Sequence, residues 1–283
     1  MLRSWIRGND TVENDWLKRT ELLLGRENIS KLQKTSVTVV GLGGVGSYAT
    51  ESLVRAGIGT IQLVDYDIVS MSNINRQLLA THATVGLFKT EVMKTRMLQI
   101  NPELKIKIYS EFLNETNRKE VLQNSDHILD AIDSIGPKMG LIKDLCEQEI
   151  PFISVLGAGN RLNPEFIKIM SIWQTSGCPF AKRLKKLLRK YDILKDFLVV
   201  FSEEKPLKIS KNEHSLVGDN ASDKINCSEK NCDATAEPDL LYLPKSLIGS
   251  ISYMPAIMGM MAASTIIRNI VSNHCDDTNK QQL

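Results

Sequence analysis

The chain has 283 residues, of which 42% are hydrophobic and 24% charged, and its formal net charge is +2. This composition is that of an ordinary globular protein, which argues against a disordered or fibrous chain, and the net charge is too small to indicate a nucleic-acid or membrane partner by itself. Five scattered cysteines and no apolar leader segment argue against a disulfide framework and favour a cytoplasmic location.

In chain order, the pattern predicts a helical arm and then alternating strands and helices. Residues 15–32 are predicted to be helical, and between residues 36 and 155 short apolar runs alternate with segments of helical periodicity. The predicted strands are 37–40, 61–64, 105–109, 127–132 and 152–156, and the predicted helices are 46–55, 89–100, 115–123 and 138–149. We therefore expect a doubly wound, mainly parallel, Rossmann-like α/β fold, because such alternation is typical of a parallel sheet covered by crossover helices.

The second half of the chain predicts an extension of the same domain with an antiparallel and helical portion. Strands are predicted at 165–173 and 197–201, an amphipathic helix at 179–191, and a polar loop at 210–238. Residues 246–267 carry no charge and are long enough to span a bilayer, but their polar residues and glycines favour a core helix from about Pro255, with membrane association as the less favoured alternative. We divide the chain into an N-terminal arm (1–34), a nucleotide-binding core (35–160) and a C-terminal extension (161–283).

A glycine-rich segment follows the first predicted strand and begins the next helix. Its glycines are Gly41, Gly43, Gly44 and Gly46. Small residues let backbone N–H groups approach a phosphate, and the helix N-terminus adds a partial positive charge. Asp65, at the end of the second strand, can accept hydrogen bonds from ribose hydroxyls. Together these features predict a nucleotide site without deciding which nucleotide binds.

The residues after the second strand favour triphosphate chemistry over a redox dinucleotide. Arg76 and Lys89 can neutralise phosphate charge that builds up during transfer, and Asn73 can donate a hydrogen bond to a phosphoryl oxygen. Asp133 and Ser134 follow the fourth strand, where ligands gather in open α/β sheets. We expect Asp133 to bind Mg²⁺ and Ser134 to line the same nucleotide site.

At these residues the sequence resembles the ThiF/MoeB/HesA superfamily of adenylating enzymes, over about residues 19–158. The resemblance implies that ATP and Mg²⁺ are bound by Gly43, Asp65, Asn73, Arg76, Lys89 and Asp133. It also implies that an N-terminal arginine reaches into the active site of a neighbouring subunit. Arg19 occupies that position, so a homodimer is expected if it acts in this way. The alternative is an exposed helix arginine without such a role.

Further segments resemble one branch of that superfamily, the tRNA threonylcarbamoyladenosine dehydratases: residues 130–138, 175–179, 199–202 and 249–253. The resemblance implies an ATP-dependent enzyme that adenylates the threonyl carboxylate of the modified adenosine in tRNA and releases pyrophosphate. The carbamoyl group then closes a ring and AMP leaves. The alternative is adenylation of the C-terminal Gly-Gly of a ubiquitin-like sulfur carrier, with a sulfur-transfer or carrier protein as partner. The absence of any Cys-x-x-Cys pair counts against that alternative.

The cysteines and the basic residues of the helix at 179–191 are further candidates for a function, and each also has a purely structural interpretation. Cys178 is a rival candidate for thioester or persulfide chemistry, with a packed thiol favoured, and Cys227 and Cys232 are predicted to be exposed thiols rather than metal ligands. The basic side chains of the helix at 179–191 are candidate tRNA contacts: Lys182, Lys185, Lys186 and Arg189. A merely solvated face and a membrane-surface face are the alternatives for this helix.

Overall fold

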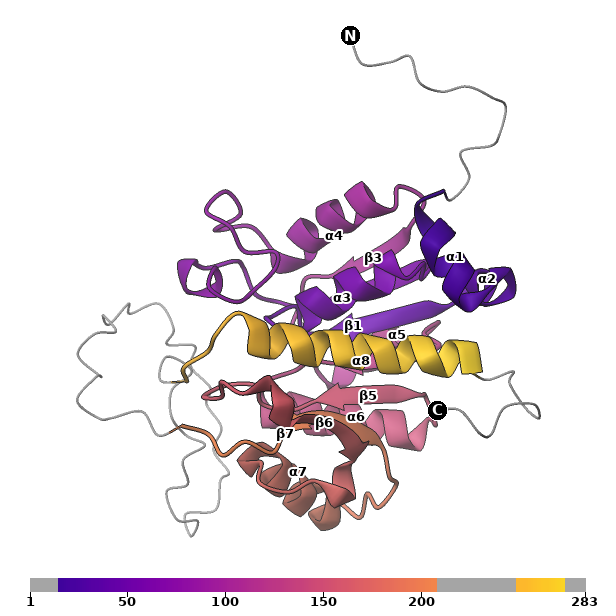
Figure 1. The fold of residues 1–283 in the computed structure, drawn as a ribbon. Coiled ribbons are helices and arrows are strands. Elements are labelled where there is room, and N and C mark those ends of the chain that lie inside the picture. Colours follow the sequence, from indigo (N-terminus) through magenta and orange to yellow (C-terminus); the bar gives the residue numbers. More distant parts are fainter. Residues whose placement is uncertain (1–14, 208–247, 273–283) are drawn as a thin grey trace, which may run out of the picture.

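The computed structural model describes residues 15–207 and 248–272 (Figure 1). The predicted polar loop at 210–238 and three of the cysteines, Cys227, Cys232 and Cys275, lie outside the described residues. The described chain forms a seven-stranded sheet in the order β3-β2-β1-β4-β5-β7-β6. Every neighbouring pair is parallel except β6 with β7. The predicted doubly wound, mainly parallel sheet with an antiparallel C-terminal portion is confirmed.

The strands are β1 (Ser36–Val40), β2 (Thr60–Val64), β3 (Lys105–Tyr109), β4 (His127–Asp130), β5 (Phe152–Val155), β6 (Ile167–Ser171) and β7 (Leu198–Ser202). The α-helices are α1 (Lys18–Leu24), α2 (Arg26–Lys34), α3 (Gly46–Arg55), α4 (Lys89–Ile100), α5 (Glu115–Leu122), α6 (Ile135–Glu147), α7 (Pro179–Lys190) and α8 (Tyr253–Ser272). Short 3₁₀ helices are η1 (Asp15–Leu17), η2 (Met71–Asn73), η3 (Pro164–Phe166) and η4 (Ile172–Gln174).

Several predicted boundaries were wrong for local reasons. The single helix predicted at 15–32 is divided at Gly25, whose φ of 83° is outside the helical range. Helix α6 begins at Ile135 rather than 138, because Pro137 lies in its first turn, where a proline removes no intrahelical hydrogen bond. The strand predicted at 127–132 ends at Asp130, whose carboxylate accepts from the N–H of Ile132 at 3.1 Å. The strand predicted at 165–173 shrinks to β6 because a 3₁₀ helix flanks it on each side.

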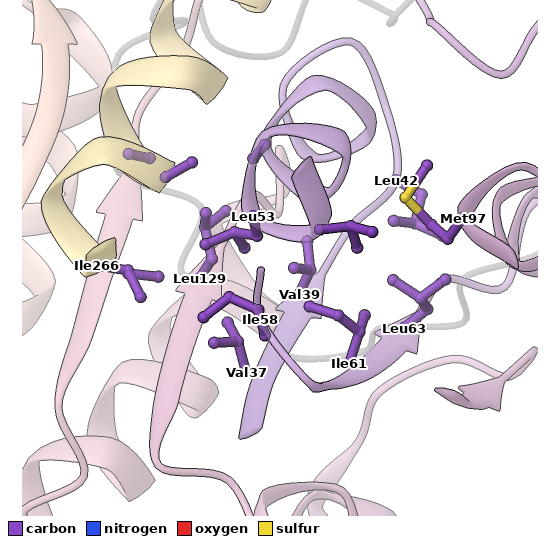
Figure 2. Packing of buried hydrophobic residues seen from close by; sticks show 14 of the residues in the cluster. Val37, Val39, Leu42, Leu53, Ile58, Ile61, Leu63, Met97, Leu129 and Ile266 are labelled. Atoms are coloured by element: carbon purple, nitrogen blue, oxygen red, sulfur yellow. The ribbon is translucent and has the colours of Figure 1, made fainter. Parts of the chain in front are cut away.

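Both faces of the sheet are covered, so its central strands are apolar throughout. All five residues of β1 are buried, with Val39 packing on the side of α3 and α4, and Val40 on the side of α5 and α6. Figure 2 shows the first of these cores, where Val37 and Leu129 from two strands lie near Leu53 of α3 and Ile266 of α8. The C-terminal helix is therefore part of the central core.

Helix α8 crosses α3 at very short range. A Cβ atom on Gly259 would lie 2.3 Å from the carbonyl oxygen of Val45, so only glycine permits this approach. Within the described residues α8 is the one helix long and apolar enough to cross a membrane by length and composition, but 56% of its most apolar window is buried. The burial favours the predicted core helix.

The strand order reverses between β1 and β4, which is where open α/β sheets bind ligands. The loops that follow these two strands touch there. A Cβ on Gly41, just after β1, would lie 2.8 Å from the carbonyl oxygen of Ala131, just after β4. The glycine-rich loop and the loop that carries Asp133 are thus neighbours at the carboxyl edge of the sheet.

Candidate active site

The glycine-rich loop is shaped by two close backbone approaches. Gly41 has a φ of 91°, and its N–H donates to Val64 on β2 at 2.8 Å. A Cβ on Gly46 would lie 1.7 Å from the carbonyl oxygen of Gly41, a contact that no side chain permits. Above Gly43 the space is open, since among residues 15–207 and 248–272, apart from Gly43 and its two chain neighbours, one atom comes within 4 Å of a Cβ placed there. The loop thus presents backbone to a free volume at the start of α3, as a phosphate site requires.

Asp65 is buried beside this loop and is held by backbone groups. Its carboxylate accepts from the N–H of Leu42 at 2.6 Å and from the N–H of Asp67 at 2.8 Å. Burial raises the pKa of Asp65, while the nearby charge of Lys89 and the two backbone N–H donors oppose the rise. The carboxylate therefore anchors the loop, and its remaining lone pairs fit the predicted contact with ribose hydroxyls.

Lys89 is only 4% exposed, and its ammonium contacts a residue that follows β2. It donates to the carboxylate of Asp67 at 2.7 Å, and its own backbone N–H donates to the carbonyl of Asp67 at 3.1 Å. Asp67 is the more exposed partner, at 42% of its side chain. The ion pair with Asp67 thus fixes the position of a buried cation near Asp65, which contacts the glycine-rich loop.

Arg76 and Asp133 are close enough to influence each other. Burial lowers the pKa of Arg76, and the negative charge of Asp133 opposes that shift. The guanidinium donates to the carbonyl of Ser72 at 2.8 Å, which aims it from the turn that also carries Asn73. The Asn73 amide oxygen accepts from the N–H of Ser70 at 3.2 Å, so its NH₂ group is the part suited to a phosphoryl oxygen.

Asp133 lies on the exposed loop between β4 and α6, with Ser134 next to it donating to its carboxylate at 3.0 Å. Within residues 15–207 and 248–272, no group of three His, Cys, Asp or Glu side chains could enclose a metal ion. A single exposed carboxylate nevertheless fits Mg²⁺, which is usually bound through one or two carboxylates together with substrate phosphates and water.

The structure does not bring Arg19 to this site within one chain. Helix α1, which carries it, lies at the right of Figure 1, whereas the loops after the strands lie at the left. The neighbouring Leu17 packs on Gly57, before β2 begins. Arg19 is exposed, and α1 has no buried residue, with Leu22 and Leu23 about four-fifths exposed at 79% and 82%.

The basic residues of α7 divide into two groups. Lys185 donates to the carbonyl of Thr175 at 2.7 Å, and the guanidinium of Arg189 lies 5.2 Å from the ring centre of Trp173. Those two side chains stabilise the packing of α7. Lys182 and Lys186 are exposed, one helical turn apart on the same face, and remain candidates for a polyanion.

The loop after β5 connects the site to the C-terminal extension. Asn160 exchanges hydrogen bonds with the backbone of Gly249, at 2.8 and 2.7 Å. On the other side, the amide of Asn75 donates to the carbonyl of Ser250 at 3.1 Å. Residues 249–250 therefore join the loop after β5 to the turn that carries Arg76.

Cys178 is placed beside this loop as a packed thiol. It is 4% exposed, and the guanidinium of Arg161 donates to its sulfur at 3.4 Å and to the carbonyl oxygens of Gly157 and Gly159. Its surroundings match the favoured interpretation of a structural residue, although its lack of chemistry stays a prediction.

Sequence reasoning assigned no role to several residues that support the site. Asp67 holds Lys89, and Lys138 forms a fully buried ion pair with Asp130 at 2.6 Å. Ser154 joins that pair, because its hydroxyl donates to Asp130 at 2.7 Å and accepts from Lys138 at 3.0 Å. The sequence does offer one sign of such a buried pair, which is a charged residue within an otherwise apolar run. Asp130, which precedes the apolar Ala131 and Ile132, is an example.

Together, the switch-point glycine loop, the buried carboxylate and the converging cations define a nucleotide-binding protein of the doubly wound α/β class. A family model described as the ThiF family matches residues 17–283, and the chain belongs to this family. The resemblance seen in its motifs is thereby confirmed.

Named relatives agree in fold and length. The chain is 34% identical over 256 residues to a tRNA threonylcarbamoyladenosine dehydratase of Bacillus subtilis, covering 90% of this chain and 94% of the relative. A crystal structure of the E. coli tRNA N6-threonylcarbamoyladenosine dehydratase in complex with AMP superposes with a TM-score of 0.75 at 28% identity, covering 93% of this chain and 98% of that one. The same E. coli enzyme in complex with ATP superposes with a TM-score of 0.76 at 27% identity, covering 95% and 100%.

Proposed function

We propose that this protein is an ATP-dependent enzyme that dehydrates threonylcarbamoyladenosine in tRNA. The observation that carries the proposal is the arrangement of Arg76, Lys89 and Asp133 around an open glycine loop, in a chain similar over nearly its whole length to dehydratases. Cations and a carboxylate in this arrangement suit a triphosphate and its counter-ion. The similarity of the whole chain, beyond the nucleotide site, favours the tRNA substrate.

In the proposed reaction the threonyl carboxylate attacks the α-phosphorus of ATP and pyrophosphate leaves. The carbamoyl group then attacks the carbonyl carbon of the acyl adenylate, loses a proton and closes a ring, and AMP carries away the former carboxylate oxygen. Lys89 and Arg76 neutralise charge on the phosphates, and Asp133 would hold Mg²⁺, which supplies further charge neutralisation when bound. No protein nucleophile is needed, because both reacting groups are tethered on one nucleoside.

The alternative substrate, a ubiquitin-like carrier ending in Gly-Gly, would use the same first step. Purified protein should release AMP from ATP and Mg²⁺ in the presence of tRNA that carries threonylcarbamoyladenosine, and the nucleoside should lose one water. Unmodified tRNA is the matched control. AMP release that depends on a Gly-Gly carrier and ignores the modified tRNA would favour the alternative, and ATP binding without turnover would favour a nucleotide-sensing scaffold.

A homodimer with a shared site is part of the proposal, supported by the exposed apolar face of α1 next to Arg19. Because Arg19 lies far from the site of its own chain, it could serve only the site of a second chain. Mixing Arg19→Ala subunits with Asp133→Ala subunits should restore activity that neither variant shows alone. Absence of recovery would argue against a shared site.

We also propose a cytoplasmic location, since tRNA is the substrate and the two cysteines of the described chain, Cys146 and Cys178, form no disulfide.

A further inference from the structure

Gln77 carries a buried amide that lacks part of its hydrogen bonding. The residue follows Arg76 and is 6% exposed, and its Oε1 atom is buried without a hydrogen-bond partner in the described part of the chain. One other buried side-chain atom there shares this state, the hydroxyl of Ser36 at the start of β1. Buried polar groups are nearly always paired, so each exception calls for a physical reason.

The backbone around Gln77 is fixed against the glycine-rich loop. Its N–H donates to the carbonyl of Asn73 at 2.9 Å, and the next N–H, that of Leu78, donates to the hydroxyl of Ser47 at 3.3 Å. The same hydroxyl donates to the carbonyl of Gly43 at 2.7 Å. Two hydrogen bonds therefore connect the residue after Gln77 to Gly43 through the hydroxyl of Ser47, and the position of the Gln77 backbone relative to the loop is set before any ligand binds.

The nitrogen of the Gln77 amide borders the space where a phosphate would lie. It is 3.9 Å from the position of a Cβ on Gly43, and outside Gly43 and its two chain neighbours it is the one atom of the described residues within 4 Å of that position. The side chain is therefore oriented with its donor toward the open volume and its acceptor into the protein. That orientation leaves Oε1 without a partner.

We propose that Gln77 is a phosphate-binding residue of the nucleotide site, donating from Nε2 to a phosphoryl oxygen above Gly43. A phosphoryl oxygen only accepts hydrogen bonds, so the donor end of the amide is the end that must face it. The unpaired Oε1 follows from holding that end in place in advance, so the cost of orienting the amide falls on folding and not on binding. This inference rests on the proposed function, since it assumes that a nucleotide phosphate occupies the loop.

Gln77 acts differently from the two cations beside it. Arg76 and Lys89 attract the phosphates by charge, which acts over a distance and restricts orientation little. A neutral amide attracts weakly but only in one direction, so it fixes the rotation of the phosphate relative to the loop. The α-phosphorus must be presented to the incoming carboxylate along one line, and a directional donor serves that need.

The test compares two variants of Gln77 with a variant of Ser36. Gln77→Met keeps an unbranched side chain of similar size without polar atoms, and Gln77→Glu replaces the donor by a negative charge. Ser36→Ala removes the other unpaired atom at the opposite, amino end of the strands. For each protein, thermal unfolding is measured without ligand, and dissociation constants are measured for ATP with Mg²⁺ and for adenosine.

We expect Gln77→Met to unfold at the wild-type temperature or above it, yet to bind ATP about tenfold more weakly, as one charge-assisted hydrogen bond is lost. Its affinity for adenosine should equal that of the wild type, because adenosine carries no phosphate. Gln77→Glu should weaken ATP binding more than Gln77→Met does, since a carboxylate repels the phosphates. Ser36→Ala should bind ATP like the wild type.

Unchanged ATP affinity in both Gln77 variants would overturn the inference. Equal losses for adenosine and ATP would also overturn it, because they would place Gln77 against the nucleoside rather than the phosphates. A wild-type protein that does not bind ATP at all would instead refute the proposed function, and the two failures are therefore distinguishable.

Discussion

The ammonium group of Lys138 on α6 lies 2.6 Å from the carboxylate of Asp130 at the end of β4, and neither side chain has any exposed surface. Burial lowers the pKa of Lys138, and the charge of Asp130 opposes this shift. The other carboxylate oxygen of Asp130 accepts from the N–H of Ile132. The ion pair thus fixes the start of the loop that carries Asp133.

Removing one partner of this pair should cost far more stability than removing both charges. Lys138→Met leaves Asp130 as a buried, unpaired carboxylate, and we expect a loss of about 3–5 kcal/mol in the free energy of unfolding. In the double variant with Asp130→Asn, the amide can still accept from Ile132 and donate to Ser154, so most of the loss should be recovered. Urea unfolding of the three proteins measures this, and a double variant as unstable as the single one would contradict it.

The pair also illustrates which features the sequence could predict and which it could not. Strand β1 and the turn into α3 are local: a short β-branched run followed by glycines predicts both, and the structure places them as expected. The contact among Asp130, Lys138 and Ser154 depends on the register of β4 with β5, which sets Asp130 directly beside Ser154. Register is decided by tertiary packing, so no window of sequence reveals it.

The same distinction applies within the candidate site. Asp65 and Asp133 were predicted because each follows a strand, and Arg76 and Lys89 because they lie in the polar segment after the second strand and at the start of the next helix. The structure gathers them at the carboxyl edge of the sheet. The supporting residue Asn160 was not predicted. Its contacts run to Gly249, almost ninety positions later (|i−j| = 89), and a loop residue with such distant partners leaves no periodic signal.

Gly43 and Gly46 of the glycine-rich loop should lose different amounts of stability when replaced by alanine. At Gly46 the added methyl group would lie 1.7 Å from the carbonyl oxygen of Gly41, so Gly46→Ala must displace the loop and should cost at least about 3 kcal/mol of stability. At Gly43 the methyl group has space, and Gly43→Ala should change stability by no more than about 1 kcal/mol.

At Gly43 alanine should weaken nucleotide binding even though it changes stability little. The methyl group there occupies the volume proposed for a phosphate, so ATP affinity should fall by about tenfold or more while the fold is retained. Urea unfolding and ATP titration of both variants provide the comparison. If Gly43→Ala binds ATP as tightly as the wild type does, the phosphates do not lie above Gly43.

His127, the first residue of β4, should make stability depend on pH. Burial lowers the pKa of this imidazole from its usual 6.5, and the charge of Asp126 opposes the shift only in part. Above pH 6.5 neither the folded nor the unfolded chain binds the proton, so the contribution of His127 to stability is fully present. As the pH falls below that value, the unfolded chain binds the proton first and stability is lost, until the lowered pKa of the folded state is reached.

The variant His127→Gln should therefore flatten the loss of stability between about pH 7.5 and about pH 5.5, by no more than about 1.4 kcal/mol per pH unit. Urea unfolding at both pH values measures this difference. His82→Gln, at an exposed position, is the matched control. A slope for His127→Gln that equals the wild-type slope would show that other groups cause the pH dependence.

The division of the basic residues on α7 changes which substitutions can test tRNA binding. Reversing the charge of Lys185 or Arg189 would break the bond to Thr175 or the contact with Trp173, and weaker binding could then reflect local unfolding. Lys182 and Lys186 are exposed and have no such packing role in the described contacts. The double variant Lys182→Glu, Lys186→Glu therefore isolates the charge of this surface.

We expect this double variant to bind tRNA about tenfold more weakly at physiological salt. The slope of the affinity against salt should fall by about 1 for each lysine that contacts a phosphate. The matched control is Lys105→Glu, Lys119→Glu, which changes the net charge equally on exposed positions of β3 and α5. A weakening of equal size in both variants would indicate that net charge alone matters. Because the proposed nucleotide site is made of other residues, ATP affinity should be unchanged in both variants. A loss of ATP affinity would show that α7 supports the nucleotide site rather than the tRNA.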